Sequence, residues 1–432
     1  MSAAQPLAGI RVIDLTSVVM GPLGTQMLAD LGADVIAIEA PLGDANRHMG
    51  TGPHPELSGV ALNLLRNKRS IVLDLRSESG HDALLRLIRT ADVFVTNLRP
   101  GSRERARITR GDLAQARPDL IWCAAAGYPE DSDRADDAAY DDIIQAATGL
   151  VNVAERSGLP PVLSPTLLVD KVCGMALAQA VTTGLLHRER TGEGSETVLA
   201  MYDIVRGFLL VEHGAAAIAE PPQGRSGYPR LLSHERRPLR TTDGLVVILA
   251  YERHQFEGLI TIGGRREMRA DERFMTRLGR LDHIDELYRE YQRIADGHST
   301  ASFLAACADH GVPAAAVETL DDIVAGLPLV EHPVAGTYRH TPPLVGGLGV
   351  TEGPRRPAPL LGEHGREVLA EVGLSETEID ALEETGVREL GRGPLHLVEI
   401  EVCLLCHTRR RDTIARRERG RKSGRIRLKE IQ

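Results

Sequence analysis

The sequence predicts an α/β protein in which a large domain with a doubly wound parallel sheet is combined with a smaller α+β domain. The first observation is a series of short runs rich in branched apolar residues, which are typical of buried parallel strands. These runs lie at 10–15, 34–40, 70–75, 92–97 and 120–127. The second observation is that helical patterns, such as 25–33 and 77–91, lie between several of the runs. Strands that alternate with helices indicate a parallel sheet with helices on both faces.

The third observation is a change of pattern after about residue 205. Residues 227–251 predict a loop and a hairpin that turns at Asp243-Gly244. Helical patterns follow at 283–295 and 300–311, then a loop rich in Pro and Gly, and then a last helical pair that ends near Leu390. We therefore divide the chain into four parts. They are a large domain (1–205), a linker with the small domain (206–335), a C-terminal segment (336–390) and a basic tail (391–432) outside the fold.

Composition excludes several classes of protein. The 432 residues include 51 Lys and Arg against 60 Asp and Glu, so the net charge of −9 gives no sign of a nucleic-acid or anionic-membrane partner. Only the tail is basic, with twelve Lys or Arg against five Asp or Glu from residue 391 onward. The five cysteines form no disulfide framework, and the N-terminus lacks the pattern of a signal peptide. No apolar run approaches the roughly 20 residues of a membrane helix, and we expect a cytoplasmic protein.

Motifs for resident cofactors are absent or weak. The glycines after the first strand do not fit G-x-G-x-x-G, and no stretch matches a P-loop. Gly21-Pro22 stands where a helix should follow the first strand, so it indicates either an anion-binding helix start or a simple turn. The run Cys403–His407 has the letters of a haem-attachment motif, but a single C-x-x-C is a weak metal signal. We expect no metal and no permanently bound cofactor.

Polar side chains follow the third and fourth predicted strands. A basic run at 66–69 precedes the third strand, Arg76 follows it, and Asn97, Arg99 and Arg105 follow the fourth. Because the carboxyl ends of parallel strands meet at one edge of a sheet, we expect Arg76, Asn97, Arg99 and Arg105 to share one rim. Guanidinium groups bind phosphate well. The alternative is a solvated basic surface.

The stretch "LSPTLLVDKVCGMALAQAVTTG" (163–184) contains one acid, Asp170, at the head of a run of small and apolar residues. The run predicts a helix that begins near Asp170. The helix dipole and the free amides of the first turn favour an ionised, nucleophilic carboxylate. Gly174 and the nearby alanines would leave room for a bulky substrate. The alternative is that Asp170 only caps the helix.

Seven stretches, in order from Pro6 to Val387, resemble the family III CoA-transferases, the group of the formyl-CoA and carnitine CoA-transferases. They are 6–47, 67–80, 91–108, 140–150, 170–194, 311–323 and 356–375. The resemblance implies a homodimer of two chains threaded through one another as interlocked rings. It also implies that residues 336–390 return to the large domain after the small domain is complete.

The resemblance further implies a reaction in which coenzyme A moves from an acyl-CoA thioester to a carboxylic acid. Asp170 would attack the thioester and form a mixed anhydride, and coenzyme A thiolate would then form an aspartyl-CoA thioester. The acceptor acid would repeat these steps in reverse. Carried over position by position, the coenzyme site comprises Val18, Leu73, Arg76, Asn97, Leu98, Arg99, Arg105 and Ala106.

Some positions depart from the family pattern. This chain has Val19, Ala40 and Ala138 where a well-known member has glutamine, arginine and lysine, and it lacks that member's "GGGG" lid. These losses argue against an oxalate-type acceptor. The pair Glu212-His213 is a further candidate for the acyl pocket.

Two other functions remain as alternatives. An α-methylacyl-CoA racemase needs a histidine beside the aspartate that begins the "DDIIQ" stretch, and this chain has Tyr140 before Asp141. Tyrosine is a poor acid or base at neutral pH, which argues against proton transfer at that place. A non-catalytic protein that binds acyl-CoA is the second alternative, and the presence of Asp170 argues against it.

Overall fold

A six-stranded parallel sheet forms the centre of the large domain in the computed structural model, which describes residues 5–347 and 349–386. The strand order is β3-β2-β1-β4-β5-β6. The strands are β1 (Arg11–Leu15), β2 (Asp34–Glu39), β3 (Lys68–Val72), β4 (Val93–Thr96), β5 (Ile121–Ala126) and β6 (Ser195–Ala200). The basic tail and Cys403–His407 lie outside the described residues.

The five predicted strands are confirmed, and one of them lies earlier in the chain than predicted. The third strand begins at Lys68, two residues before the predicted start, and ends at Val72. The sixth strand, β6, was not predicted. It lies at the edge of the sheet and none of its side chains is fully buried, so its sequence "SETVLA" lacks the apolar run that marked the others.

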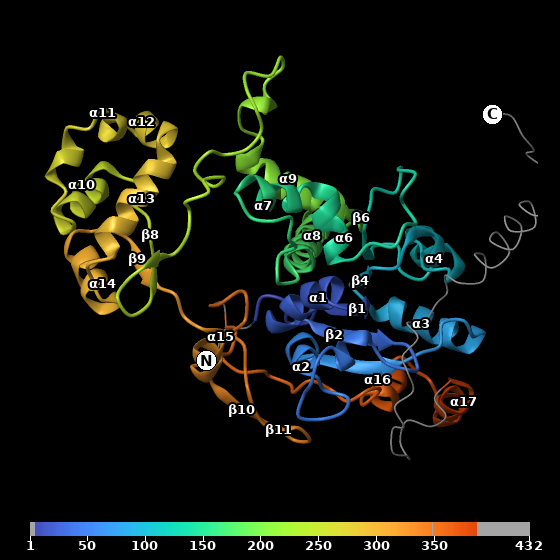
Figure 1. Cartoon of the computed structure of the whole chain (residues 1–432). Coiled ribbons are helices and arrows are strands. Elements are labelled where there is room, and N and C mark those ends of the chain that lie inside the picture. Colours follow the sequence, from blue (N-terminus) through green and yellow to red (C-terminus); the bar gives the residue numbers. More distant parts are fainter. Residues whose placement is uncertain (1–4, 348, 387–432) are drawn as a thin grey trace, which may run out of the picture. The chain divides into compact units, whose positions relative to one another are not determined.

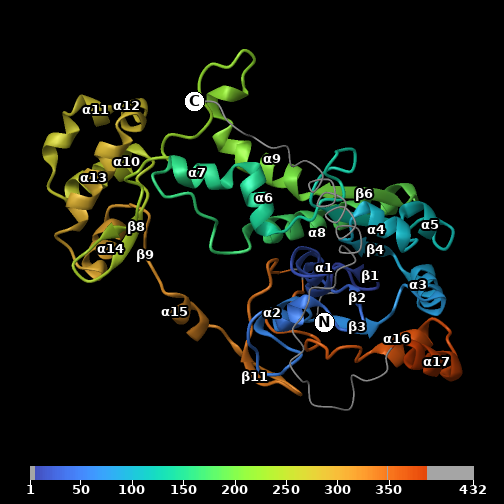
Figure 2. The same ribbon diagram turned by 45° about the vertical axis from the view of Figure 1, so that its right-hand side comes forward.

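Helices cover both faces of the sheet (Figures 1 and 2). One buried cluster joins the sheet to α1 (Met20–Asp30), α6 (Asp141–Thr148), α8 (Leu168–Thr191) and α9 (Met201–His213). The opposite cluster joins it to α3 (Glu78–Thr90), α5 (Arg110–Ala114), α16 (Gly365–Glu371) and α17 (Glu376–Gly386). The large domain is therefore the doubly wound α/β architecture that the sequence predicts.

Glycines set the distance between α1 and α8. A Cβ atom at Gly24 would lie 2.8 Å from the carbonyl oxygen of Gly174, and one at Gly174 would lie 2.6 Å from the carbonyl oxygen of Met20. The two backbones are thus in direct contact. The expectation that Gly174 leaves room for a substrate was wrong, because neighbouring helix α1 occupies that space.

A buried ion pair fixes α1 on the sheet. Lys68, at the start of β3, has no solvent exposure, and its Nζ lies 3.0 Å from Asp14 Oδ2 on β1. The same ammonium group donates to the hydroxyl of Thr25 and to the carbonyl of Pro22, both on α1. Arg66 and Arg69, its neighbours in the basic run, are also buried and pair with Asp30 and Asp34. The run 66–69 is therefore largely structural.

The middle of the chain combines a small antiparallel sheet with several helices. Its antiparallel sheet has the order β7-β8-β9 and its helices share a separate core. The elements are β7 (Leu239–Arg240), β8 (Leu245–Ile248), α10 (Arg253–Ile262), η3 (Arg266–Arg269), α11 (Glu272–Met275), α12 (Arg277–Asp282), α13 (Ile284–Ala295), α14 (Thr300–Asp309) and β9 (Ala314–Ala316). The boundary expected after residue 205 falls inside α9, whose Val205 belongs to a core cluster of the large domain.

The segment after the small unit packs against the large sheet. It contains α15 (Leu320–Ala325) and the hairpin β10 (Leu329–His332) with β11 (Gly336–Arg339). Arg47 donates to the carbonyl of Pro359 at 3.0 Å, and Arg69 on β3 binds Glu371 on α16 at 2.6 Å. Val368 and Ile379 complete the core on this face.

Short elements connect these parts. They are η1 (Ala45–His48), α2 (Gly59–Leu64), α4 (Pro100–Arg105), α7 (Leu150–Arg156) and η2 (Ala215–Ile218). Within residues 5–347 and 349–386, no helix has both the length and the apolar character needed to cross a membrane.

Candidate active site

The sheet has a topological switch point between β1 and β4, where the strand order reverses direction. In open α/β sheets, ligands bind in the crevice at the carboxyl ends of the strands on either side of such a point. Here the two ends are joined by Asn97. Its Oδ1 accepts a hydrogen bond from the amide of Ser17 at 3.0 Å, and its Nδ2 donates to the carbonyl of Ser17 at 2.9 Å.

The next residue, Val18, has an unusual backbone with φ of +70°. A β-branched residue is strained in this left-handed region, and such strain persists only where the surroundings impose it. Asp44 does so, because its two carboxylate oxygens accept from the amide of Val18 at 3.1 and 3.2 Å. Burial, opposed by the amides of Asn46 and Val18, raises the pKa of Asp44 to about 6. The loop 16–19 is thus held from β4 by Asn97 and from the end of β2 by Asp44.

Asp170 is the third residue of α8, as the sequence predicts, and its side chain is only 7% exposed. Burial, and then repulsion from Asp141, raise its pKa to about 6. In the part of the chain that the structure describes, no donor forms a hydrogen bond with the Asp170 carboxylate. Its backbone amide donates to Asp141 Oδ1 at 3.1 Å. The carboxylate is therefore mostly buried, has no hydrogen-bond donor and lies next to a second acid, an arrangement typical of a reactive group.

Asp141 and Gln145 position the start of α8. Gln145, one turn further along α6, donates to the second carboxylate oxygen of Asp141. Its Oε1 accepts from the amide of Ser164 at 2.8 Å in the loop that leads into α8. Leu167, the last residue before α8, packs against the apolar cluster of Val19, Leu23 and Leu64, and Val18 packs against the same cluster. The structure therefore brings the helix end that carries Asp170 against the loop at the switch point.

The other predicted residues lie at the carboxyl ends of β3 and β4, or in α4 beyond. Arg76 is exposed and paired with Asp74, with Nε and Oδ1 2.8 Å apart. Arg99 Nη1 donates to the carbonyl of Asp136 at 2.7 Å. Arg105 is exposed and donates to the hydroxyl of Ser102 at 2.9 Å. A Cβ atom at Gly101 would lie 3.1 Å from Asp136 Oδ2 and 3.3 Å from Arg105 Nη1, so Arg99 and Arg105 both lie beside Asp136.

The apolar members of the predicted set belong to the packing below this edge. Leu73 is a buried member of the core on the α3 face, and Leu98 and Ala106 pack against that core from its border. Ala106 also ends α4. No group of three or more His, Cys, Asp or Glu residues suited to a metal ion occurs among residues 5–347 and 349–386.

Sequence reasoning missed Asp44 and the Asp141–Gln145 pair as parts of the site. A signal for the first existed in "PLGDANR", where an acid follows a Pro-Gly turn directly after the second strand. The second had only the i, i+4 spacing of Asp141 and Gln145 on a helix, which many helices show without any such role.

Comparison with known proteins shows what this arrangement resembles. The model of CoA-transferase family III matches residues 7–365. The chain is 31% identical to a succinate–glutarate CoA-transferase of Agrobacterium fabrum over 386 residues, covering 85% of this chain and 96% of that protein. It is 30% identical to a formyl-CoA:oxalate CoA-transferase of Shigella sonnei over 421 residues, covering 88% and 99%.

Solved structures agree with the sequence comparison. A crystal structure of Rv3272 from Mycobacterium tuberculosis, described as a probable fatty acyl-CoA transferase, superposes with a TM-score of 0.72 at 30% identity and covers 84% of this chain and 99% of that one. A CaiB/BaiF family protein from Brucella suis superposes with a TM-score of 0.70 at 27% identity, covering 85% and 99%.

Proposed function

The chain belongs to CoA-transferase family III, and from this premise we propose that it transfers coenzyme A between carboxylic acids through covalent intermediates on Asp170. The observation that carries the proposal is the state of Asp170, a buried carboxylate without a hydrogen-bond donor, at the start of a helix that touches the loop of the switch point. This position suits a nucleophile facing a ligand bound at the carboxyl ends of the strands.

The proposed reaction has four steps. The Asp170 carboxylate attacks the carbonyl carbon of the donor thioester, which forms a mixed anhydride and expels coenzyme A thiolate. The thiolate attacks the Asp170 carbonyl carbon, which releases the donor carboxylate and leaves an aspartyl-CoA thioester. The acceptor carboxylate attacks that thioester and forms a second anhydride with release of thiolate. The thiolate then attacks the acceptor carbonyl, which yields the new acyl-CoA and free Asp170.

The surroundings of Asp170 favour these steps. With its pKa raised to about 6 by burial and by Asp141, the carboxylate remains mostly ionised at pH 7, so the nucleophilic form predominates. Poor solvation makes that ion more reactive than an exposed carboxylate. Each acylation also neutralises Asp170 and therefore removes its repulsion with Asp141. The dipole of α8 also favours negative charge that develops at its N-terminal end.

We propose that the acids exchanged are not of the oxalate type, because Val19, Ala40 and Ala138 replace polar residues found in an oxalate-handling member. The relatives above are named for acids as different as glutarate, fatty acids and formate, so the class is best found by experiment. Pairs of donor thioesters and acceptor acids can be incubated with the protein and the acyl-CoA products identified by mass spectrometry. Absence of exchange across dicarboxylic, hydroxy and fatty acids would contradict the proposal.

We propose that Arg105 contacts a phosphate of coenzyme A. Its guanidinium is exposed and, within the described residues, donates one hydrogen bond, to the hydroxyl of Ser102. Charge-assisted hydrogen bonds contribute roughly 1.5–3 kcal/mol, so Arg105→Ala should raise the dissociation constant at least about tenfold. Calorimetric titration with coenzyme A measures this. Arg107→Ala is the matched control, because Arg107 is exposed in the same segment but paired with Glu78. Equal affinities of the two variants would refute the placement.

We propose that the protein works as an interlocked homodimer. In addition to the family resemblance, α8 and α9 expose large apolar side chains, including Met175, Leu186, Phe208 and Val211, which is 83% exposed. Several large apolar side chains exposed on two helices are compatible with an interface that covers them. We expect sedimentation at micromolar concentration to give a single species of twice the chain mass. A stably folded monomer under those conditions would contradict the proposal.

A further inference from the structure

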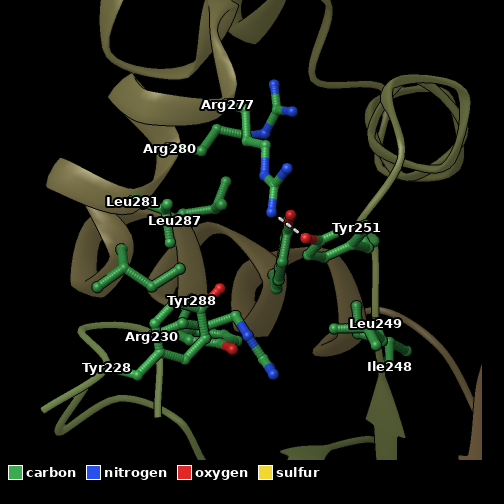
Figure 3. A pocket seen from close by; sticks show the side chains of 13 residues that line it. Tyr228, Arg230, Ile248, Leu249, Tyr251, Arg277, Arg280, Leu281, Leu287 and Tyr288 are labelled. Atoms are coloured by element: carbon green, nitrogen blue, oxygen red, sulfur yellow. Dashed lines mark hydrogen bonds between the residues drawn. The ribbon is translucent and has the colours of Figure 1, made fainter. Parts of the chain in front are cut away.

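The small unit contains a hollow that the transfer reaction does not explain (Figure 3). The space inside it amounts to about 50 Å³, or to about 500 Å³ when the open solvent at its mouth is included. Its walls come from the end of β8, the helices α12 and α13, and the segment around Tyr228 and Arg230. None of these residues lies in the elements that surround Asp170.

The hollow has an apolar base and a polar edge. Ile248, Leu287 and Tyr291 are buried members of the core of the unit, each less than 9% exposed, and contribute to the wall. Tyr251 and Arg277 are exposed at the opening, and a hydrogen bond joins the Arg277 guanidinium to the Tyr251 hydroxyl (Figure 3). An amphipathic molecule could therefore place an apolar body inside and a polar group near the opening.

Two buried polar atoms in the wall have no partner in the described part of the chain. They are the hydroxyl of Tyr291, a residue that is 4% exposed, and Nε of Arg230. The ring of Tyr291 packs edge-on against Tyr288 at 6.0 Å between centroids, which limits its freedom to turn toward another partner. A buried polar group without a hydrogen bond is costly, so both atoms indicate an acceptor that occupies the hollow.

Positive charge in the wall has no carboxylate partner in the described residues, and Arg230, Arg277 and Arg280 lie over the rings of Tyr228, Tyr251 and Phe256. Within the described residues, Arg230, Arg277 and Arg280 form no ion pair with a carboxylate. Other arginines on neighbouring helices and turns do, and these are Arg265, Arg269, Arg273, Arg289 and Arg293. Burial raises the pKa of Tyr291 and the charge of Arg280 opposes that shift, which places this guanidinium near the buried hydroxyl.

We propose that this hollow binds an organic carboxylate with an aryl or short apolar body. The body packs against Ile248 and Leu287, while the carboxylate oxygens accept hydrogen bonds from the arginines and from the Tyr291 hydroxyl. The planar arginine fork matches a carboxylate with two parallel hydrogen bonds. The apolar base disfavours inorganic phosphate, which would leave that surface bare. This ligand site is separate from the coenzyme site and does not depend on the proposed role of Asp170.

Phenylacetate is a suitable probe, with the full-length protein and no coenzyme A present. Calorimetric titration should show saturable binding. Arg280→Met should weaken it at least about tenfold, because a charge-assisted hydrogen bond is lost. Tyr291→Phe should weaken it about threefold or more and leave the melting temperature nearly unchanged, because the hydroxyl has no partner to lose. Arg289→Met, on α13 but paired with Glu235 outside the hollow, should bind as the unmodified protein does.

Benzyl alcohol and inorganic phosphate distinguish the parts of the ligand. Benzyl alcohol should bind at least about tenfold more weakly than phenylacetate because it lacks the charge, and phosphate should show no comparable binding. The proposal is overturned by a lack of saturable phenylacetate binding, or by phosphate binding equally well. It is also overturned if Tyr291→Phe and Arg280→Met, both folded by circular dichroism, bind phenylacetate unchanged, because the acid would then occupy another site.

Discussion

Replacing Asp170 with asparagine should reduce coenzyme A transfer at least about 10³-fold, the loss expected when a covalent nucleophile is removed. The amide has nearly the shape of the carboxylate but lacks the nucleophilic charge. Because Asp170 sits on α8 and the proposed coenzyme contacts lie on other elements, affinity for coenzyme A should change less than about twofold. Steady-state transfer assays and calorimetric titration measure the two quantities. Asp142→Asn is the matched control, since Asp142 is an exposed acid next to Asp141.

Chemical trapping tests the same assignment independently. Both the anhydride and the aspartyl-CoA thioester are electrophilic at the Asp170 carbonyl carbon. Hydroxylamine should therefore convert that side chain to a hydroxamate, and borohydride should reduce it, only when acyl-CoA is present. Peptide mass spectrometry locates the label. Transfer by the Asp170→Asn protein at near the normal rate, or a label on another residue, would falsify the mechanism. A racemase would instead introduce deuterium at the α-carbon without any adduct on the enzyme.

Replacing Lys68 with methionine should lower the free energy of unfolding by about 3–5 kcal/mol. The substitution keeps a similar volume but leaves the 2%-exposed carboxylate of Asp14 without its cationic partner. It also removes the donor that the carbonyl of Pro22 and the hydroxyl of Thr25 share. Urea denaturation followed by circular dichroism measures the change.

A surface pair provides the comparison for Lys68. Arg206 and Asp203 are about half exposed and lie 2.8 Å apart on α9. Arg206→Met should cost less than about 1 kcal/mol, because exposed ion pairs are well solvated and contribute little. If Lys68→Met were as mild as Arg206→Met, the buried pair would not be holding α1 on the sheet. Adding Asp14→Asn to Lys68→Met should recover part of the loss, because no unpaired charge then remains.

The sequence was sufficient for the architecture because strong local patterns encode it. Buried interior strands such as "VFVT" (β4) and "IWCAAA" (β5) are continuous runs of buried residues with few other interpretations. The edge strand β6 lacks such a run and was missed. The position of Asp170 at a helix start was also predictable, since an acid precedes a long apolar stretch without proline.

Features that depend on contacts between distant segments were not predictable. A glycine in the sequence can face either a ligand or a neighbouring helix. Only the close approach of α1 in the structure shows that Gly174 faces a helix. Likewise, Lys68 and Arg76 are both basic residues beside β3, yet the first is fully buried in an ion pair and the second is exposed. Tertiary partners decide such cases, and composition gives no information about them.

The contact between α1 and α8 also bears on how accurately Asp170 can be placed. Peptide backbones meet there directly, and a backbone has no rotamers through which it can yield. Asp170 lies one turn before Gly174 on the same helix, so the rigid contact at Gly174 also restricts movement of the Asp170 backbone. For a nucleophile this matters kinetically, because a displacement of about 1 Å from the attacking geometry can cost about a hundredfold in rate. The two glycines thus allow α1 and α8 to pack closely, and this close packing limits movement of the attacking oxygen away from its position.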